Sequence, residues 1–528
     1  LDYSLLDIAN KKVIETNTLT AFDTQKSFRT ATIKLSQGLD TSKEYGFQIT
    51  LTTSYSKKIH FYTRIKYYTN DFFLSQKLDF VNNFHNATFD KNSSFDISPY
   101  LEANTDDDST FANVTIHSSK SLITWKKLKP KKITSVIPTI KELNIETAAI
   151  YQDYYVQAES DSGLETYHVK EFYRVRYSGN RIYLLGYNRK MESFFDPELI
   201  SLKKSEFKIG ITNDKDIHLT SSDSNKKVAF VRNGSLWYYD LKSNKLSSVF
   251  SFAQKSNDYL RENYDQHDIQ ILKVKDNGDI SFILYGYMNC GDYEGRVGIL
   301  LYDYSAKNNR ITERVYIPLT NKYQQLKEDL GNFSYVNEKN IFYFSLNNIV
   351  YAYNISSKRY DILTEHADRD HFSMLQKAKC FVWSNQNKAG QTDYITILDL
   401  ETAKQLTVSA PVNESIVVLG TIDANLVYGF VKNNDIYEST TGDIIKPAYQ
   451  LIISDCKGTI LRKYHSKNNY ITSASVENNV IHLNRVKKKN GRFVSMSGDT
   501  IMNQKDTQAK SFNLTSRVTQ KMLTEQYL

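Results

Sequence analysis

Short apolar runs separated by Asn-containing turns recur along the last two thirds of the chain. Four segments each read as an apolar strand, an Asn-Gly or Asn-Asn pair, and a second apolar strand. They span residues 229–245, 342–358, 427–439 and 471–487. Asn and Gly accept the positive φ angles that two-residue hairpins require. Each segment therefore predicts a β-hairpin.

The strand after the turn ends in a second recurring pattern, in which Asp or Asn follows an apolar pair and precedes a polar turn with Lys. The residues at this position are Asp240, Asp303, Asn354 and Asp399, and Asp455 and Asn188 extend the series at similar spacing. A side-chain oxygen there accepts hydrogen bonds from the backbone of the following turn. We expect these residues to cap turns and not to bind a ligand.

The recurring positions lie about fifty residues apart, which is typical of a β-propeller blade with four short strands. From about residue 150 onward the chain resembles bacterial β-propeller repeat proteins in this pattern. The resemblance implies a fold and no particular function, because propellers host binding and catalysis alike. Seven blades are expected, with six or eight as alternatives, near 151–210, 217–252, 267–320, 333–365, 372–410, 414–467 and 470–528. The last is the least regular, so we expect it to need a strand from elsewhere in the chain.

The first 140 residues follow a different pattern. Residues 45–73 alternate apolar and polar side chains for nearly thirty positions, and residues 111–128 do the same. We predict no helix of useful length between them. Long alternating strands joined by polar loops predict an antiparallel β-sandwich at 1–140, followed by a propeller domain at 141–528. The predicted fold class is all-β, with helical excursions only at 256–267 and 323–333.

Composition narrows the function classes. The 528 residues are 40% hydrophobic and 24% charged, which is typical of a soluble chain of several domains. The net charge of +8 is spread evenly, so no nucleic-acid partner is predicted. The three cysteines, Cys290, Cys380 and Cys456, lie far apart in the sequence and predict neither a disulfide framework nor a zinc site.

The cellular compartment is predicted from the amino-acid composition and the predicted architecture. The Lys, Asn, Tyr, Ser and Ile bias resembles a bacterial gene of low GC content, and no apolar run is long enough to span a membrane. The first twelve residues lack a basic region followed by an apolar core. We expect an exported protein, extracellular or on the cell surface, that meets a membrane only through an anchor outside this sequence.

One glycine-rich stretch stands out as a candidate binding loop. Residues 286–298 hold four of the twenty glycines and are predicted to form an enlarged hairpin between the second and third strands of a blade. Its candidate ligand-binding residues are Asn289, Asp292, Tyr293, Glu294 and Arg296. The alternative is a surface hairpin held together by its own salt bridge.

The starts of two blades carry further candidates. These are His267 and Asp268 in one blade and Arg369, Asp370 and His371 in another, and innermost strands begin near a propeller's channel. The alternative for them is capping of loops. No nucleophile, phosphate-loop or metal motif is found, so no catalytic residue and no cofactor is predicted.

These patterns favour a non-enzymatic binding or scaffold protein of the bacterial cell envelope. Its predicted partner is a polysaccharide or another protein, recognised through the propeller face. The alternative is a propeller-fold glycoside hydrolase or lyase, since two carboxylates brought together at a channel mouth leave no local motif.

Overall fold

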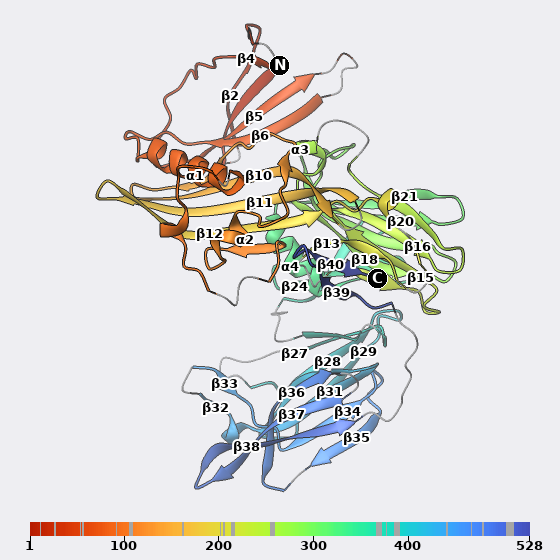
Figure 1. Ribbon diagram of the computed structural model, residues 1–528. Helices are drawn as coiled ribbons and strands as arrows, with labels where there is room; N and C mark the ends of the chain where they lie inside the picture. Colours follow the sequence, from red (N-terminus) through yellow and green to blue (C-terminus); the bar gives the residue numbers. More distant parts are fainter. Residues whose placement is uncertain are drawn as a thin grey trace. The chain divides into compact units, whose positions relative to one another are not determined.

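The structure is a computed structural model of the whole chain (Figure 1). It describes residues 1–528 except 11, 26–27, 53, 55–57, 91, 105–108, 161–162, 201, 204–205, 213–216, 254–258, 366–371, 376, 385–390, 440–441, 466, 478–479 and 503–511. The chain forms two compact units. Unit 1 contains Leu1–Asp265, Tyr287–Arg296 and Phe512–Leu528, and unit 2 contains Gln266–Gly286 and Val297–Ser511.

The all-β class is confirmed for the described residues. Strands dominate both units, and the four α-helices that the structure describes contain only 16, 4, 4 and 10 residues. Two of them lie where helical excursions were predicted, namely α3 (Tyr259–Glu262) and α4 (Tyr323–Asn332). In α4 the buried residues Leu326 and Leu330 are one turn apart, as an amphipathic helix requires.

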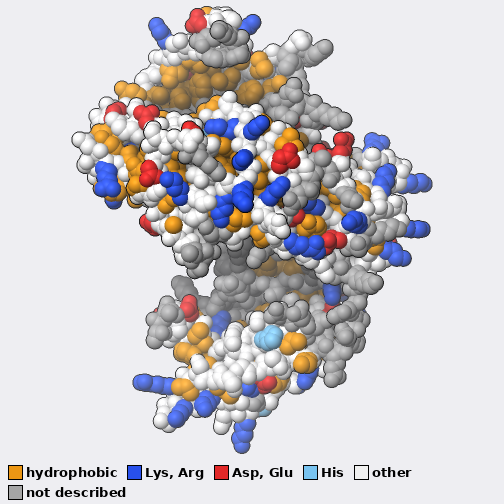
Figure 2. Space-filling view, in the orientation of Figure 1, with side chains coloured by type: hydrophobic (Ala, Val, Ile, Leu, Met, Phe, Trp, Pro, Cys, Tyr) orange, Lys and Arg blue, Asp and Glu red, His pale blue; other side chains and the backbone are white. Residues whose placement is uncertain are grey.

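Unit 1 begins with a four-stranded antiparallel sheet in the order β2-β1-β5-β6. Its strands are β1 (Asp2–Asp7), β2 (Lys12–Thr18), β5 (Tyr45–Thr52) and β6 (Lys58–Ile65), and a small hairpin joins β3 (Asp23–Gln25) to β4 (Phe28–Thr30). The alternation at 45–65 thus forms two antiparallel strands, with Tyr45 opposite Ile65. Hydrophobic side chains gather over this sheet (Figure 2), and Val13, Leu51 and Phe61 are among the exposed ones.

The prediction that the first 140 residues contain no helix of useful length was wrong. Helix α1 (Leu74–Phe89) buries Phe80, Phe84 and Ala87, which recur at helical spacing. The charged residue Lys77 lies among the buried positions of this helix, so the hydrophobic pattern of the sequence did not reveal them. Lys77 can be buried because its ammonium donates to the carbonyls of Phe72, Asn144 and Ile145. The long strand predicted from the alternation at 111–128 is also wrong. That segment forms the short strand β7 (Asn113–Thr115) and the one-turn helix α2 (Lys120–Ile123).

A second sheet of unit 1 contains the longest strands. Strands β10 (Thr147–Ser160), β11 (Gly163–Ser178) and β12 (Arg181–Ser193) pair in sequence, flanked by β7 and β8 (Lys131–Lys132), and β9 (Thr139–Leu143) also pairs with β10. One face shares a hydrophobic core with α1 and α2. The first predicted blade, 151–210, is therefore wrong, because these strands are 14, 16 and 13 residues long. The domain boundary expected at residue 140 falls inside β9. The second sheet therefore contains strands from both sides of that boundary.

The remaining predicted blade segments correspond to small antiparallel sheets. Four-stranded sheets form from β14–β17 (Leu219–Phe250) in unit 1, and from β18–β21 (His267–Leu319), β22–β25 (Ser334–Thr364), β26–β29 (Phe372–Ser409) and β30-β31-β34-β35 (Glu414–His465) in unit 2. The hairpin β32–β33 (Tyr437–Ile445) is inserted in the last of these, and β36–β38 (Asn469–Met502) form a three-stranded sheet. The final strand, β40 (Thr524–Tyr527), pairs instead with β13 (Lys208–Ile211) of unit 1, and β39 (Thr515–Val518) pairs with β40. The irregular end of the chain thus uses an earlier strand, as expected.

At most of the predicted turn-capping positions, the Asp or Asn side chain accepts hydrogen bonds from the backbone of the following turn. Backbone N–H groups two or more residues later donate to Asp240, Asn354, Asp399 and Asp455. Asp303 differs, because it accepts from the Ser281 hydroxyl and the Arg314 guanidinium, while Asp279 accepts from the N–H of Ala306 in that turn. Asn188 lies within β12 opposite Phe172, so its place in the series was wrong.

Candidate ligand-binding pocket

The glycine-rich hairpin belongs to unit 1 and is closed by its own backbone. The N–H of Met288 donates to the carbonyl of Arg296, and the N–H of Gly295 donates back to Met288. Arg296 and Asp292 are exposed, and Tyr293 is half-buried. These three residues remain a predicted contact site.

The other two candidates in this hairpin hold it in place. The Asn289 side chain is buried, and its amide donates to the carbonyls of Glu262 and Tyr264 at 2.9 Å each. The Glu294 carboxylate accepts two hydrogen bonds from Arg261, at 3.0 Å from Nε and 2.7 Å from Nη2. A planar guanidinium fits a carboxylate in this bidentate way. The predicted salt bridge therefore exists, but its cation comes from α3 and not from Arg296.

A glycine in this hairpin permits a close approach by β6. Gly295 has φ of +79°, and a Cβ added there would lie 2.8 Å from the hydroxyl oxygen of Tyr62. Tyr62 also packs edge-on against Tyr287, with ring centroids 6.4 Å apart. Burial, and next the Glu294 carboxylate, raise the pKa of Tyr62. The concentration of glycines in this hairpin is thus explained in part by its packing against the N-terminal sheet.

Two of the candidates at the blade starts belong to unit 2. In unit 2, His267 is buried in β18 opposite Gly286, and Asp268 lies 3.4 Å from the Lys327 ammonium. The other three, Arg369, Asp370 and His371, lie outside the described residues. Within the part of the chain that the structure describes, no group of three or more His, Cys, Asp or Glu side chains is placed to hold a metal ion.

A cavity of about 570 Å³ opens in unit 1 on the face of the long sheet opposite α1; we call it the unit 1 pocket. Five segments line it, contributing Ile133, Thr134, Tyr155, Gln157, Leu164, Glu165, Thr166, Ser193, Phe194, Phe195, Asp196, Ile200, Lys208 and Gly210. Alternation along β10 explains its position. Tyr154 and Val156 point into the hydrophobic core, so Tyr155 and Gln157 point to the other face.

Backbone and ring contacts fix the wall of this pocket. The Ile133 N–H donates to the carbonyl of Tyr155, and the Tyr155 N–H donates to the Thr134 hydroxyl at 2.9 Å. The Tyr155 ring is stacked on His168 and on Phe194, with centroids 4.6 and 5.4 Å apart. Its two faces are therefore already in contact with protein. At the rim, Ile133 and Leu164 are 48% and 55% exposed, which leaves apolar surface open to solvent.

An ion cluster stands at one end of the pocket. The Lys208 ammonium lies 2.7 Å from a carboxylate oxygen of Glu165 and 2.9 Å from one of Glu525. A register shift in β13 between Lys208 and Gly210 aims Lys208 at both acids, as β-bulges commonly do. Gly210 is required there, because its φ is +129° and an added Cβ would lie 2.9 Å from the Ser193 hydroxyl oxygen.

No local pattern in the sequence indicates this pocket. Its residues come from five separated segments, and each segment alone resembles an ordinary strand or loop. The one visible hint was the pair Phe194-Phe195 directly after a strand. Both side chains line the cavity, and Phe195 also packs into a hydrophobic cluster of unit 1.

Comparisons with known proteins find only weak structural similarity. No protein family matches the chain, and no curated protein sequence is similar to it. Solved structures with weak similarity include a mitotic checkpoint complex, with 10% identity and a TM-score of 0.28 over 58% of this chain and 85% of that one. An acylaminoacyl peptidase from Pyrococcus horikoshii has 11% identity and a TM-score of 0.27 over 68% of this chain. A dipeptidyl peptidase 4 from Porphyromonas gingivalis has 11% identity and a TM-score of 0.24 over 54% of this chain.

These neighbours have β-propeller-like folds. The chain spans about half the length of the two peptidases, 52% and 53% respectively. Similarity at this level carries no conclusion about activity. Of the described helices, none has the length and apolar character needed to cross a membrane.

Proposed function

We propose that this protein is an exported bacterial binding protein that recognises an apolar segment of a partner protein through the unit 1 pocket. The observation that carries the proposal is the pocket itself. Its volume of about 570 Å³ lies in the range of ligand-binding cavities, and six of its fourteen lining residues are aromatic or aliphatic, namely Ile133, Tyr155, Leu164, Phe194, Phe195 and Ile200. The exported location rests on the composition and the repeat pattern.

The lining favours a protein segment over the other predicted partner, a polysaccharide. Sugars bind through hydroxyl hydrogen bonds and by stacking on open aromatic faces. The Tyr155 ring has both faces in contact with protein, and the open surface at the rim is aliphatic, from Ile133 and Leu164. Apolar anchors placed in such pockets supply most of the binding energy in protein interfaces.

The alternative, a glycoside hydrolase, is less well supported by the acids at this pocket. A glycosidase holds the scissile bond between its two carboxyl groups. Here the Lys208 ammonium occupies the space between Glu165 and Glu525 and contacts both. Glu165 and Glu525 are therefore better explained as members of a structural ion cluster with Lys208.

We further infer that the small sheets are the blades of a seven-bladed propeller. The support is their number, since the described residues from 208 onward form six sheets in sequence order and a seventh from β13, β39 and β40. The sandwich expected at 1–140 remains a proposal, with the four-stranded sheet of residues 2–65 as one of its two layers. The hairpin residues Asp292, Tyr293 and Arg296 remain a second proposed contact.

Binding can be tested with the full chain and a phage-displayed random peptide library, with a glycan array in parallel. We expect enrichment of peptides with clustered apolar residues. Replacing Leu164 by Asp places a charge at the rim and should weaken the selected peptides at least tenfold, because burying a leucine side chain contributes about 1.5–3 kcal/mol.

The matched control is Leu185→Asp. Leu185 is 47% exposed on β12 of the same sheet and does not line the pocket, so this variant should bind normally. Equal binding by both variants would refute the pocket as the site. Glycan binding lost in Leu164→Asp would identify a saccharide as the occupant, and sugar release from polysaccharides would support the hydrolase.

A further inference from the structure

Two cysteines that are distant in sequence come together in unit 2. Cys380 begins strand β27 (Cys380–Ser384), and Cys456 lies in the turn after β34 (Gln450–Ser454). They belong to two different small sheets but to one hydrophobic cluster, in which Cys380 is buried and Cys456 is packed against the buried residues.

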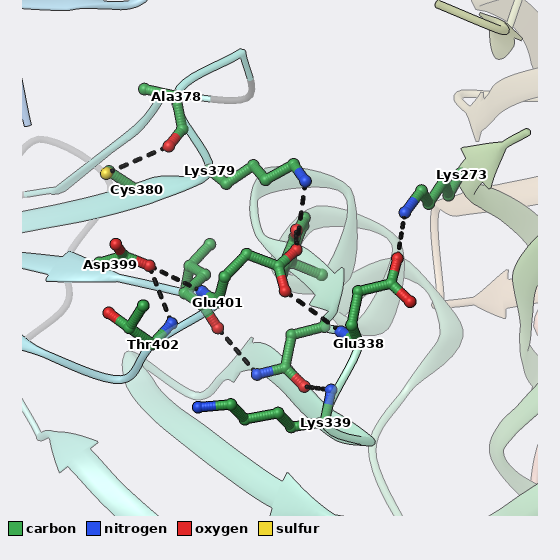
Figure 3. Close-up of polar contacts among 12 residues, drawn as sticks. Lys273, Glu338, Lys339, Ala378, Lys379, Cys380, Asp399, Glu401 and Thr402 are labelled. Atoms are coloured by element: carbon green, nitrogen blue, oxygen red, sulfur yellow. Dashed lines mark hydrogen bonds and ion pairs between the residues drawn. The ribbon is translucent and has the colours of Figure 1, made fainter.

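The backbone around both cysteines is held in place. Asp455 accepts from the N–H groups of Lys457 and Thr459, which fixes the turn that carries Cys456. The same turn packs on the neighbouring sheet, because a Cβ added at Gly458 would lie 2.8 Å from the Leu406 side chain. Cys380 donates to the carbonyl of Ala378 at 3.4 Å (Figure 3).

The two side chains lie in the same cluster and influence each other's titration. Their mutual interaction lowers the pKa of Cys456 and, together with burial, raises the pKa of Cys380. Cys456 is the more exposed of the two. The more accessible thiol is thus also the one that deprotonates more readily, as the attacking thiol in disulfide exchange must.

We propose that Cys380 and Cys456 form a reversible disulfide that links the two sheets. An external disulfide, such as oxidised glutathione, supplies the oxidising equivalents. The Cys456 thiolate attacks one of its sulfurs and releases one glutathione thiolate. Cys380 then loses its proton, attacks the Cys456 sulfur and releases the second glutathione. In total, two protein thiols are oxidised and one external disulfide is reduced to two thiols.

The experiment uses the full chain after reduction and then incubation with oxidised glutathione. Free thiols are counted, and the linked peptides are mapped by mass spectrometry. Of the three cysteines, we expect Cys380 and Cys456 to be joined and Cys290 to remain free. The Cys290→Ser variant should lose two thiols in the same way, whereas Cys456→Ser should form no internal link.

A stability measurement on the unmodified sequence supplements the mapping. The cross-link closes a long loop, so the oxidised protein should melt several degrees above the reduced protein, and reduction should reverse the shift. Glutathione that stays attached to Cys456 without an internal link would overturn the proposal. A link that involves Cys290, or no loss of thiols, would overturn it as well.

Discussion

The carboxylate of Glu171 lies in the core of unit 1 and offers a direct test of how that core is stabilised. The residue is fully buried and accepts hydrogen bonds from His85 Nδ1 at 2.8 Å, from the Tyr173 hydroxyl at 2.8 Å and from the Tyr187 hydroxyl at 3.0 Å. The guanidinium of Arg189 adds a favourable charge. Replacing Glu171 by Gln removes the charge and leaves an amide N–H₂ group facing these donors.

The expected magnitude follows from the pKa. Burial raises the pKa of Glu171, but the charge and hydrogen bond of His85, together with Arg189 and Tyr173, outweigh burial and lower it from 4.5 to about 2. At about 1.4 kcal/mol per pH unit, the ionised carboxylate contributes about 3 kcal/mol to the free energy of unfolding. Because the folded-state pKa is the lower one, this contribution is complete above pH 4.5 and is lost as the pH falls toward 2.

The assay is urea unfolding followed by the fluorescence of Trp125. This ring lies in the same core, 3.5 Å from the Arg189 guanidinium, and Trp237→Phe and Trp383→Phe make its signal unique. Glu171→Gln should lower the unfolding free energy by about 3 kcal/mol at pH 7 and by less as the pH falls below 4.5. Glu142→Gln, in an exposed pair with Arg174, should have little effect. A Glu171→Gln loss that does not change between pH 7 and pH 3 would refute the reasoning.

The remaining predictions concern turns and close contacts. Asp240→Ala removes a turn cap and should cost about 1 kcal/mol, measured by thermal melting; an unchanged melt alongside lost ligand binding would make Asp240 a ligand residue instead. Gly295→Ala should destabilise unit 1 by about 1–2 kcal/mol, because φ is positive and the new Cβ meets Tyr62. The Tyr62→Phe background should recover part of that loss in urea unfolding, and no recovery would show that the contact is unimportant.

The sequence predicted those features whose signal is local. Asn233, Asn347 and Asn348 have positive φ angles at the hairpin turns, so turn chemistry located the small sheets to within a few residues. The Asx caps at Asp240 and Asp399 were predictable for the same reason. Asp303 was not, since its partner Arg314 lies on the next strand and cross-strand pairs leave no pattern within one segment.

Features that depend on tertiary contacts were missed or remain predictions. Helix α1 buries a lysine, and its polar appearance concealed a core-facing stripe. The unit 1 pocket combines five segments, and the cluster that holds Cys380 and Cys456 joins two sheets. Conversely, the hairpin at 289–296 was correctly recognised as unusual, but Asn289 and Glu294 form internal contacts that its composition could not reveal.

Photo-crosslinking tests the central proposal, binding through the unit 1 pocket, most directly. A benzophenone amino acid placed at residue 133, on the rim, is compared with the same group at residue 185, where the native side chain has nearly equal exposure of 47% against 48%. Irradiation with a selected apolar peptide should give a covalent adduct at 133 and none at 185. Adducts at both positions, or only at 185, would contradict binding through the pocket.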